Sequence, residues 1–414
     1  MIPLISMPKL LSDIDGKIKH ILIASPEVMD IPRVRYIVEA FDRDVAITVV
    51  YPGTPEDDAP THFGSKAKRL FHRGLSHLEQ LASELPGGRD ITYLPSPNKP
   101  WMWIQDLIHV QEGNAIVPSR YSVALPTQSG REAQQNIADI VNNPFWEKHG
   151  FTINPNSTNL YSTEGGDLIV MGNTVFVGSD ILAKHLHYGM NVNVNRKVSP
   201  SAYESARNYV LSKLKTIDSE RNYRVIDVGG QPLGHHLDVV FTPIDENTVV
   251  VADIKSTLEY LNIPSKIQPV PTHQRLVRQL EEFAKRLEHE YENVVRIPLV
   301  PRLYIPENRI GSLRTDGDYT TASQDVFSLM TFNNVLQEQY TRNGRSIHRV
   351  YMPVYPIPEI VDLPGMESSK FMDIQYQALN AYQSSGVEVR PILFGNIMGF
   401  DGALRCSVKV LARG

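Results

Sequence analysis

The chain has 414 residues, of which 42% are hydrophobic, and its formal net charge at pH 7 is −5. This composition is typical of a folded globular protein and excludes an intrinsically disordered chain. The charge is spread without basic blocks, so we expect neither a nucleic-acid partner nor an anionic membrane partner. Because no apolar run approaches the roughly 20 residues of a membrane span and the start has no signal-peptide pattern, we expect a cytoplasmic protein.

Apolar runs rich in β-branched residues alternate with helical patterns along the chain. The predicted strands cover residues 20–26, 45–51, 168–177, 239–254 and 387–394. The predicted helices, with apolar residues at spacings of three and four, cover residues 66–85, 133–142, 201–214, 273–291 and 369–383. This alternation indicates an α/β or α+β architecture. No low-complexity stretch divides the chain, so we expect a single catalytic domain spanning residues 1–414.

Three segments share one plan, and they open at Asp106, Asp167 and Asp238. After the acid, each continues with an apolar run, turns at polar residues including Asn, and resumes with a second apolar run. This pattern predicts a strand, a turn and a second strand. A fourth copy is expected at residues 327–354, and a truncated copy begins at Cys406. Repeated hairpins of this kind suggest quasi-symmetric units around a shared centre.

The segment GHHLDVVF, residues 234–241, carries a histidine and an acid two positions apart. We expect a strand here, on which His236 and Asp238 point to the same face while Leu237 points to the other. An imidazole and a carboxylate would then converge on one space. By the same parity His235 is expected to be structural. Taken alone, such a pair is more often a structural histidine, with its hydrogen bonds made within the fold, beside an aspartate that caps a neighbouring element.

Two other motifs carry carboxylates. In TEGGD, residues 163–167, two glycines allow a close turn that delivers Glu164, which could orient a histidine. In WMWIQD, residues 101–106, the flat ring of Trp103 suits a planar cation, and Asp106 could accept its paired N–H donors. A hydrophilic turn and a core strand that ends in a surface acid are the plain alternatives.

Cys406, in the segment GALRC, is the only cysteine of the chain. A single cysteine forms neither an intrachain disulfide nor a site of several thiolates, so it is either an inert buried residue or a reactive thiolate. Composition alone favours the inert residue. The neighbouring Arg405 and a nearby histidine could lower the pKa of the thiol.

In this order, WIQD, EGGD, HHLD with its trailing VVFT, and GALRC together resemble the guanidino-group-modifying enzyme superfamily, which has the pentein fold. The segments EGGDLIVMGNTVFVG and HLDVVFTP are most similar to arginine deiminases and dimethylarginine hydrolases. WMWIQD looks more like the peptidylarginine deiminases. FNNVL, at residues 332–336, and the ending around Cys406 are similar to that group and to agmatine deiminases. The first hundred residues carry no specific match.

The resemblance implies a five-bladed pseudo-symmetric α/β propeller, the pentein fold, with the active site at its central axis. Mapped by motif, it implies the catalytic residues Cys406, His236 and Glu164 and the substrate-binding residues Asp106, Asp238 and Trp103. Asp167 would be a structural member of its turn. It implies no metal and no cofactor. The expected partner is a small cationic guanidino compound or an arginine side chain, and a homo-oligomer stays open.

The implied activity is that of a cysteine-dependent hydrolase, a deiminase. It would convert arginine, or an arginine-like or peptidyl-arginine group, to a ureido product and ammonia through a covalent amidino-thioether. One alternative is an amidinotransferase that moves the amidino group to an amine acceptor, and another is an arginine dihydrolase. By residue type alone, the candidates for binding a substrate carboxylate are Arg302, Arg309, Arg314 and Arg345.

Two alternatives come from other classes of protein. The first is an inactive scaffold that binds a cationic ligand, against which the complete set of five residue types argues. The second is a metal site built from His185 and His187, or from His235 and His236 with Asp238. No HExxH pattern and no paired-cysteine spacing supports the metal site.

Overall fold

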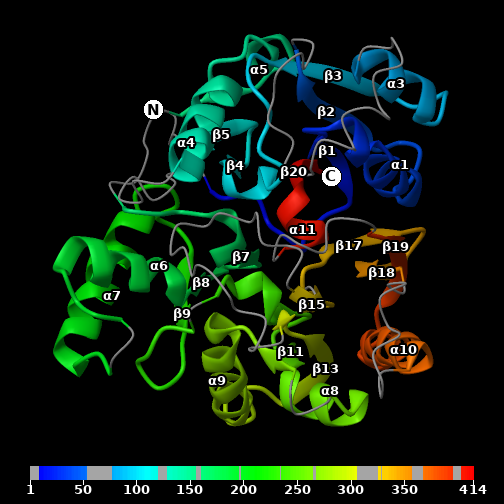
Figure 1. Ribbon diagram of the computed structural model, residues 1–414. Coiled ribbons are helices and arrows are strands. Elements are labelled where there is room, and N and C mark those ends of the chain that lie inside the picture. The colour runs from blue at the N-terminus through cyan, green and yellow to red at the C-terminus, as the bar shows by residue number, and fades with distance from the viewer. Residues whose placement is uncertain are drawn as a thin grey trace.

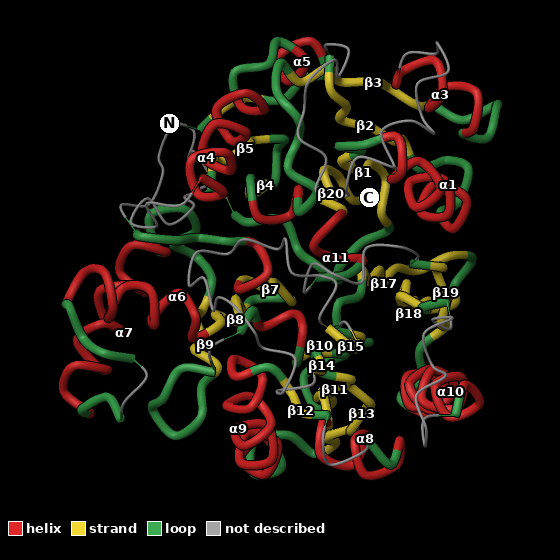
Figure 2. The backbone as a smooth tube through the Cα atoms, in the orientation of Figure 1, coloured by secondary structure: helices red, strands yellow, loops and turns green. Residues whose placement is uncertain are grey.

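The computed structural model is shown in Figures 1 and 2. The structure describes residues 9–53, 77–119, 128–154, 160–194, 197–233, 235–263, 267–304, 325–327, 329–356, 367–394 and 402–414. In this part of the chain, short sheets lie toward the inside of the molecule and most helices lie around them (Figure 2).

One strand plan recurs in five of the sheets in the described part of the chain. The first strand pairs antiparallel with the second, and the second pairs parallel with a third. The hairpins predicted after Asp106, Asp167 and Asp238 and within residues 327–354 are confirmed. Figure 1 shows the five units following one another around the middle of the molecule. The architecture is therefore mixed α/β with internal repetition.

The three hairpins predicted from their opening acids belong to three successive units. The unit after Asp106 has β4 (Ile108–Gln111), β5 (Ala115–Pro118), α4 (Gln128–Val141), α5 (Phe145–Lys148) and β6 (Thr152–Ile153). The unit after Asp167 has β7 (Leu168–Met171), β8 (Thr174–Gly178), α6 (Ser179–Lys184), η4 (His185–Gly189), α7 (Pro200–Leu214) and β9 (Asn222–Ile226). The unit after Asp238 has β10 (Phe241–Pro243), β11 (Thr248–Asp253), α8 (Ile254–Leu261), α9 (Pro271–Leu287), β13 (Asn293–Val300) and β16 (Met330–Thr331).

The fourth unit is the hairpin of β17 and β18, whose two-residue turn is Asn343–Gly344. Both turn residues have positive φ, 51° and 73°, as a type I′ turn requires. The unit consists of β17 (Leu336–Arg342), β18 (Arg345–Val354), α10 (Ser368–Ser384) and β19 (Glu388–Leu393). A small separate sheet is formed by β12 (Gln268–Pro269), β14 (Leu303–Tyr304) and β15 (Asp325–Phe327).

The two ends of the chain together form the remaining unit. The C-terminal strand β20 (Val408–Arg413) pairs antiparallel with β1 (Ile18–Ala24), and β1 pairs parallel with β2 (Ala46–Pro52). The unit is completed by η1 (Val28–Asp30), α1 (Ile31–Ala40), α3 (His77–Glu84) and β3 (Ile91–Ser96). Within the N-terminal hundred residues, which carry no motif, the described residues 18–52 and 77–96 thus complete the unit that begins at Cys406.

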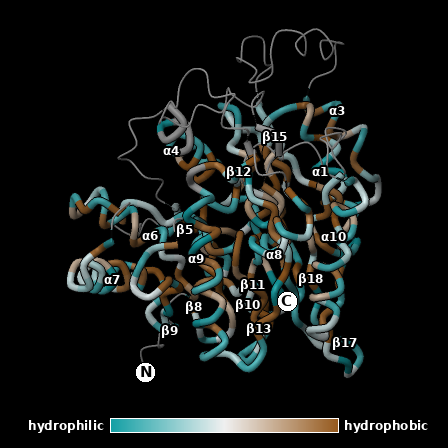
Figure 3. Tube along the Cα trace, turned by 60° about the horizontal axis from the view of Figure 1, so that its bottom comes forward, coloured by the Kyte–Doolittle hydropathy of each residue, from teal (hydrophilic) through white to brown (hydrophobic). Residues whose placement is uncertain are grey.

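The helices place apolar faces against the sheets. In α10, Phe371, Ile374, Ala378 and Tyr382 are buried at helical spacing, as the sequence periodicity predicts. The hydrophobic segments concentrate along the inner strands β10, β11 and β13 (Figure 3). Among the described helices, none is both long enough and apolar enough to cross a bilayer.

Short turns of helix carry the motif residues to the centre. These turns are η2 (Ile104–Asp106), η3 (Gly165–Asp167), η5 (Leu237–Val239) and α11 (Leu404–Ser407), and each directly precedes the first strand of a unit. Figure 1 shows α11 near the middle of the molecule. The prediction of a strand at His236 and Asp238 is wrong, because β10 begins only at Phe241. The tight turn nevertheless brings the two side chains together.

A buried carboxylate connects the fourth unit to the unit formed by the chain ends. Glu338 on β17 is fully buried and accepts hydrogen bonds from the backbone N–H of Ile18 at 3.0 Å, from Arg349 at 2.7 Å and from the Tyr351 hydroxyl at 3.0 Å. Removing such a charge leaves a buried cation with one partner fewer, which is costly.

We expect Glu338→Gln to lower the free energy of unfolding by about 3 kcal/mol, as is typical of breaking a buried ion pair. Glu388 contacts the same Arg349, but its side chain is 49% exposed. The control Glu388→Gln should therefore cost less than about 1 kcal/mol. Urea unfolding measures both, and equal costs for the two variants would contradict the assignment.

Candidate active site

The turn η3 and the turn η5 bring Glu164 and His236 into direct contact. One carboxylate oxygen of Glu164, Oε2, lies 2.6 Å from Nε2 of His236. The other, Oε1, accepts hydrogen bonds from Lys184 Nζ and from the Ser162 hydroxyl, both at 2.6 Å. Glu164 is buried, whereas the His236 side chain is 21% exposed. This arrangement fixes the imidazole and leaves part of it accessible, as a proton carrier requires.

The pKa values of Glu164 and His236 are shifted in opposite directions. Burial acts to raise the pKa of Glu164, but the positive charges of Lys184 and His236 hold that pKa well below its ordinary value. Burial acts to lower the pKa of His236, but the acids around it, chiefly Asp106 and Asp167, raise that pKa well above its ordinary value. The two groups therefore favour a carboxylate and an imidazolium.

Cys406 lies on α11 and is held by Asn334, which precedes β17. The Asn334 side-chain amide donates to Cys406 Sγ at 3.1 Å, and its carbonyl oxygen accepts from the Cys406 backbone N–H at 3.1 Å. The sulfur also lies 3.8 Å from Oδ2 of Asp238. Burial and then the charge of Asp238 raise the pKa of the thiol to about 11, while the interaction with His236 acts to lower it.

The expectation that Arg405 activates the thiol is wrong. Its guanidinium turns away to bind Asp238 Oδ2 at 2.9 Å, Asp13 Oδ1 at 2.9 Å and two carbonyl oxygens, those of Gly165 and Leu168. Arg405 is therefore the anchor of Asp238. Because only Oδ2 is used, the other oxygen, Oδ1, is buried without a hydrogen-bond partner.

Gly166 allows the site residues to approach closely. A Cβ placed on Gly166 would lie 2.5 Å from His236 Nδ1 and 3.1 Å from Asp238 Oδ1, so a side chain does not fit here. The backbone N–H of Gly166 donates to Asp106 Oδ1 at 3.0 Å. Burial raises the pKa of Asp106 to about 6, against the opposing effect of His236. The three motifs identified in the sequence thus meet at one glycine.

Trp103 and Asp167 lie beside the residues described above, Trp103 against Gly402 and Asp167 between η3 and η5. The Trp103 ring is partly buried and lies against Gly402, where a Cβ would approach the ring to 2.8 Å. Asp167 is buried and accepts a hydrogen bond from the Leu237 backbone N–H at 3.2 Å, which ties η3 to η5. Asp167 thus has the structural place in its turn that the family resemblance implies.

Of the histidines considered for a metal site, His185 and His235 lie in structural surroundings. The His185 ring stacks on Tyr209, with 4.4 Å between centroids. His235 accepts the His236 backbone N–H at 2.9 Å.

Ligand atoms of Asp106, Glu164 and His236 lie within 4.8 Å of one another, a spacing that a metal ion could use. We do not assign them as ligands, because both oxygens of Glu164 are engaged by Lys184, Ser162 and His236.

Sequence reasoning missed two residues of the site. Lys184 lies at the end of α6, and nothing in its local sequence marks it as functional. Asn334 lies in FNNVL, which entered only through the family resemblance.

The arginines considered for a substrate carboxylate are only partly within the described residues. Arg309 and Arg314 lie outside the described part of the chain. Arg345 begins β18 opposite the last residue of the seven-residue strand β17. It is therefore roughly 20 Å from Asn334, at the far end of the hairpin. Arg302 follows β13, which runs parallel to β11, whereas β10 runs antiparallel to β11. The end of β13 therefore lies at the same edge of the sheet as the start of β10, which η5 precedes.

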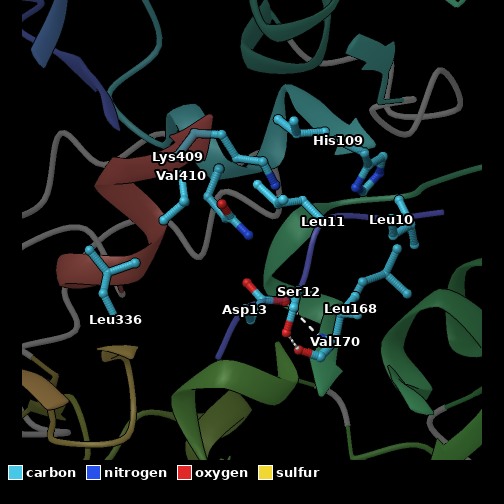
Figure 4. A pocket seen from close by; sticks show the side chains of 12 residues that line it. Leu10, Leu11, Ser12, Asp13, His109, Leu168, Val170, Leu336, Lys409 and Val410 are labelled. Atoms are coloured by element: carbon cyan, nitrogen blue, oxygen red, sulfur yellow. Dashed lines mark hydrogen bonds between the residues drawn. The ribbon is translucent and has the colours of Figure 1, made fainter. Parts of the chain in front are cut away.

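A small cavity adjoins the ion pairs of Arg405. Asp13, His109 and Lys409 line it together with apolar residues of several units (Figure 4). Its volume is about 20 Å³, which suffices for one water molecule. The cavity is too small for a guanidinium compound and is not the substrate site.

The reactivity of the single cysteine should report the raised thiol pKa. We expect alkylation of Cys406 by iodoacetamide, applied in short pulses, to rise with a midpoint near pH 11, well above the ~8.5 of a free cysteine. Asp238→Asn should lower this midpoint because it removes a negative charge beside the sulfur. The matched control is Asp245→Asn, an exposed acid at the turn between β10 and β11, which should leave the midpoint unchanged. A midpoint at or below about 8.5 in the parent protein would contradict the geometry.

The fold was compared with known proteins. No protein-family model and no curated protein sequence matches the chain.

Solved structures do match. An agmatine deiminase from C. jejuni, with substrate bound, gives a TM-score of 0.56 at 13% identity and covers 97% of this chain and 96% of its own. An agmatine deiminase of Enterococcus faecalis gives 0.53 at 13% identity, with 97% and 95% covered. A candidate arginine deiminase from Porphyromonas gingivalis gives 0.55 at 17% identity, with 97% of each chain covered. At these identities the likeness concerns the fold: the chain shares the fold of these deiminase structures.

Proposed function

We propose that the protein is a deiminase that hydrolyses a guanidino group, with Cys406 as nucleophile. The observation that carries the proposal is the buried oxygen Oδ1 of Asp238, which has no hydrogen-bond partner and belongs to a carboxylate 3.8 Å from the sulfur. An unpaired buried acceptor is costly. The N–H group of a bound guanidinium would satisfy it and would place the guanidinium carbon near the thiol.

The remaining groups suit a planar cation. Asp106 offers a second carboxyl group beside Gly166, and the Trp103 ring offers a flat apolar wall. A bound cation would offset the negative charge of Asp238, which after burial is the largest cause of the raised thiol pKa. Binding the substrate would therefore help to form the thiolate.

The proposed reaction has two halves. The Cys406 thiolate adds to the guanidinium carbon, the bond from that carbon to one terminal nitrogen breaks, and His236 gives its proton to the departing ammonia. The amidino group is then attached to sulfur. In the second half His236 accepts a proton from water, the hydroxide adds to the same carbon, the carbon–sulfur bond breaks, and the proton of the added hydroxyl group passes to solvent. The products are a ureido compound, ammonia and the free thiolate.

The finer description of the fold is part of the proposal. We propose that the five units close around one axis as a five-bladed α/β propeller. The support is that each unit delivers site residues from the segment that opens it: Asp106, Glu164, His236 with Asp238, Asn334 and Cys406. Their convergence on one point requires the openings of all five units to face a common centre.

Agmatine, arginine and peptidyl arginine are the first compounds to test. The agmatine deiminases among the structural neighbours make agmatine the first choice, and the resemblance of WMWIQD keeps peptidyl arginine in the panel. Arginine dihydrolysis would release two ammonia molecules for each substrate. Amidinotransfer begins with the same attack of the thiolate, but the bond to the substituted nitrogen breaks, the substituted amine departs, and an acceptor amine replaces water in the second half.

We expect the protein to form a ureido product and one equivalent of ammonia from at least one of agmatine, arginine, methylated arginines and arginine peptides. The Cys406→Ala variant should lose this activity entirely, because the covalent intermediate cannot form. Mass spectrometry and an ammonia assay measure the products. Full turnover by Cys406→Ala would refute the mechanism, whereas turnover that occurs only with an added amine acceptor would assign amidinotransfer instead.

A further inference from the structure

We propose that Lys184 is a positioning residue for His236 that acts through Glu164: its ammonium group holds Oε1 of the carboxylate and turns Oε2 toward the imidazole. The inference rests on the proposed function, because it assigns a partner to the proposed proton carrier. Lys184 lies at the C-terminal end of α6, on a different element from both Glu164 and His236. It was not among the residues expected from the sequence.

The contacts form one connected chain. Lys184 Nζ lies 2.6 Å from Glu164 Oε1 and 3.0 Å from Asp180 Oδ2. Glu164 Oε2 in turn lies 2.6 Å from His236 Nε2. The Glu164 carboxylate is thus held at Oε1 by Lys184 and by the Ser162 hydroxyl, also at 2.6 Å, and at Oε2 by His236, which removes its freedom to rotate away from the histidine. The side chain of Lys184 is 19% exposed and that of Glu164 only 4%, so solvent screens this contact little.

The charge of Lys184 also matters for the proton on His236. The other titratable groups that face His236 are Asp106, Asp167, Asp180, Asp238, His235 and Cys406. Most of these groups are acids, so they favour the imidazolium. Of the described residues in contact with Glu164, Lys184 is the one with a permanent positive charge. It neutralises part of the Glu164 charge and repels an imidazolium.

The direction of the effect follows from these signs. Without the lysine charge, and with Oε1 still held by the Ser162 hydroxyl, Glu164 would attract the imidazole proton more strongly, and the pKa of His236 would rise above its already raised value. The imidazolium would then lose its proton less readily, and less of the neutral imidazole would be present. Because the general-base half of the proposed reaction needs a neutral imidazole, Lys184 keeps His236 able to serve in both halves.

The test compares Lys184→Met, which keeps the length of the side chain and removes its charge, with Lys184→Arg, which keeps the charge. The matched surface control is Lys285→Met on α9, where the side chain is 67% exposed. The full-length protein carries Cys406→Ala as well, so that no chemistry interferes. Nuclear magnetic resonance of protein labelled at histidine nitrogen follows His236, assigned through its loss in His236→Asn. This readout needs no substrate and therefore stands even if guanidine turnover fails.

We expect Lys184→Met to move the titration midpoint of His236 upward by about 0.5 pH unit or more. If the imidazole stays protonated over the whole accessible range, its Nε2–H resonance should move downfield instead. Lys184→Arg and Lys285→Met should leave both signals unchanged. An unchanged or lowered midpoint together with an unmoved resonance in Lys184→Met would overturn the proposal.

In the active protein, kcat of Lys184→Met should fall about tenfold with little change in KM, since outer partners of a site commonly have effects of this size. The alkaline limb of the pH profile should move upward as well. A loss of stability without either kinetic change would show that Lys184 serves only the folding of α6.

Discussion

The guanidinium of Arg405 is the group on which the arrangement of the site depends. It is buried and directly precedes Cys406 in the sequence, yet it binds two carboxylates, those of Asp238 and Asp13, and the carbonyl oxygens of Gly165 and Leu168. These partners come from the N-terminal segment, η3, β7 and η5. A buried cation is tolerated only with such complete pairing. One side chain therefore holds three segments together at the centre: the N-terminal segment at Asp13, η3 with the start of β7, and η5.

This anchoring has an electrostatic consequence for the thiol. Arg405 uses one oxygen of Asp238 and leaves the other unpaired, so a carboxylate remains beside Cys406 with capacity for one more donor. In the free protein this charge disfavours the thiolate. A cation of the right shape would reverse that effect. Under the proposed function, binding of a positively charged substrate would favour the thiolate of Cys406, and this dependence would limit its reaction with other compounds.

The meeting of the motif residues could be predicted from the motifs taken together with the family resemblance, whereas each motif alone left a structural alternative open. Glu164, His236, Asp106, Asp238 and Cys406 lie close together because each stands where a unit begins, and the repeated plan of acid, strand, turn and strand was visible in the chain. The strand at His236 was predicted wrongly because the three-residue turn Leu237–Val239 leads into the apolar start of β10 at Phe241. The sequence pattern does not separate such a turn from the first residues of a strand. The pairing of β1 with β20 was not predicted, since residues 18–24 and 408–413 carry only a general β pattern and their partnership is set by tertiary structure.

The roles of Arg405, Lys184 and Asn334 could not be derived from sequence for a related reason. Each acts through a partner far away in the chain: Arg405 on Asp238, Lys184 on Glu164, and Asn334 on Cys406. Adjacency in sequence suggested that Arg405 serves the thiol. In the structure its side chain points to Asp238, because successive side chains of a helical turn leave in different directions.

The central claim is that this site places a guanidinium-like cation against Cys406. The most direct measurement compares the rate at which chloroacetamidine, a planar cation, labels Cys406 with that of the neutral chloroacetamide of equal size. We expect the cation to react many-fold faster at neutral pH, and this preference to disappear in Asp238→Asn. Equal rates for the two reagents, or a preference that survives in Asp238→Asn, would contradict the account.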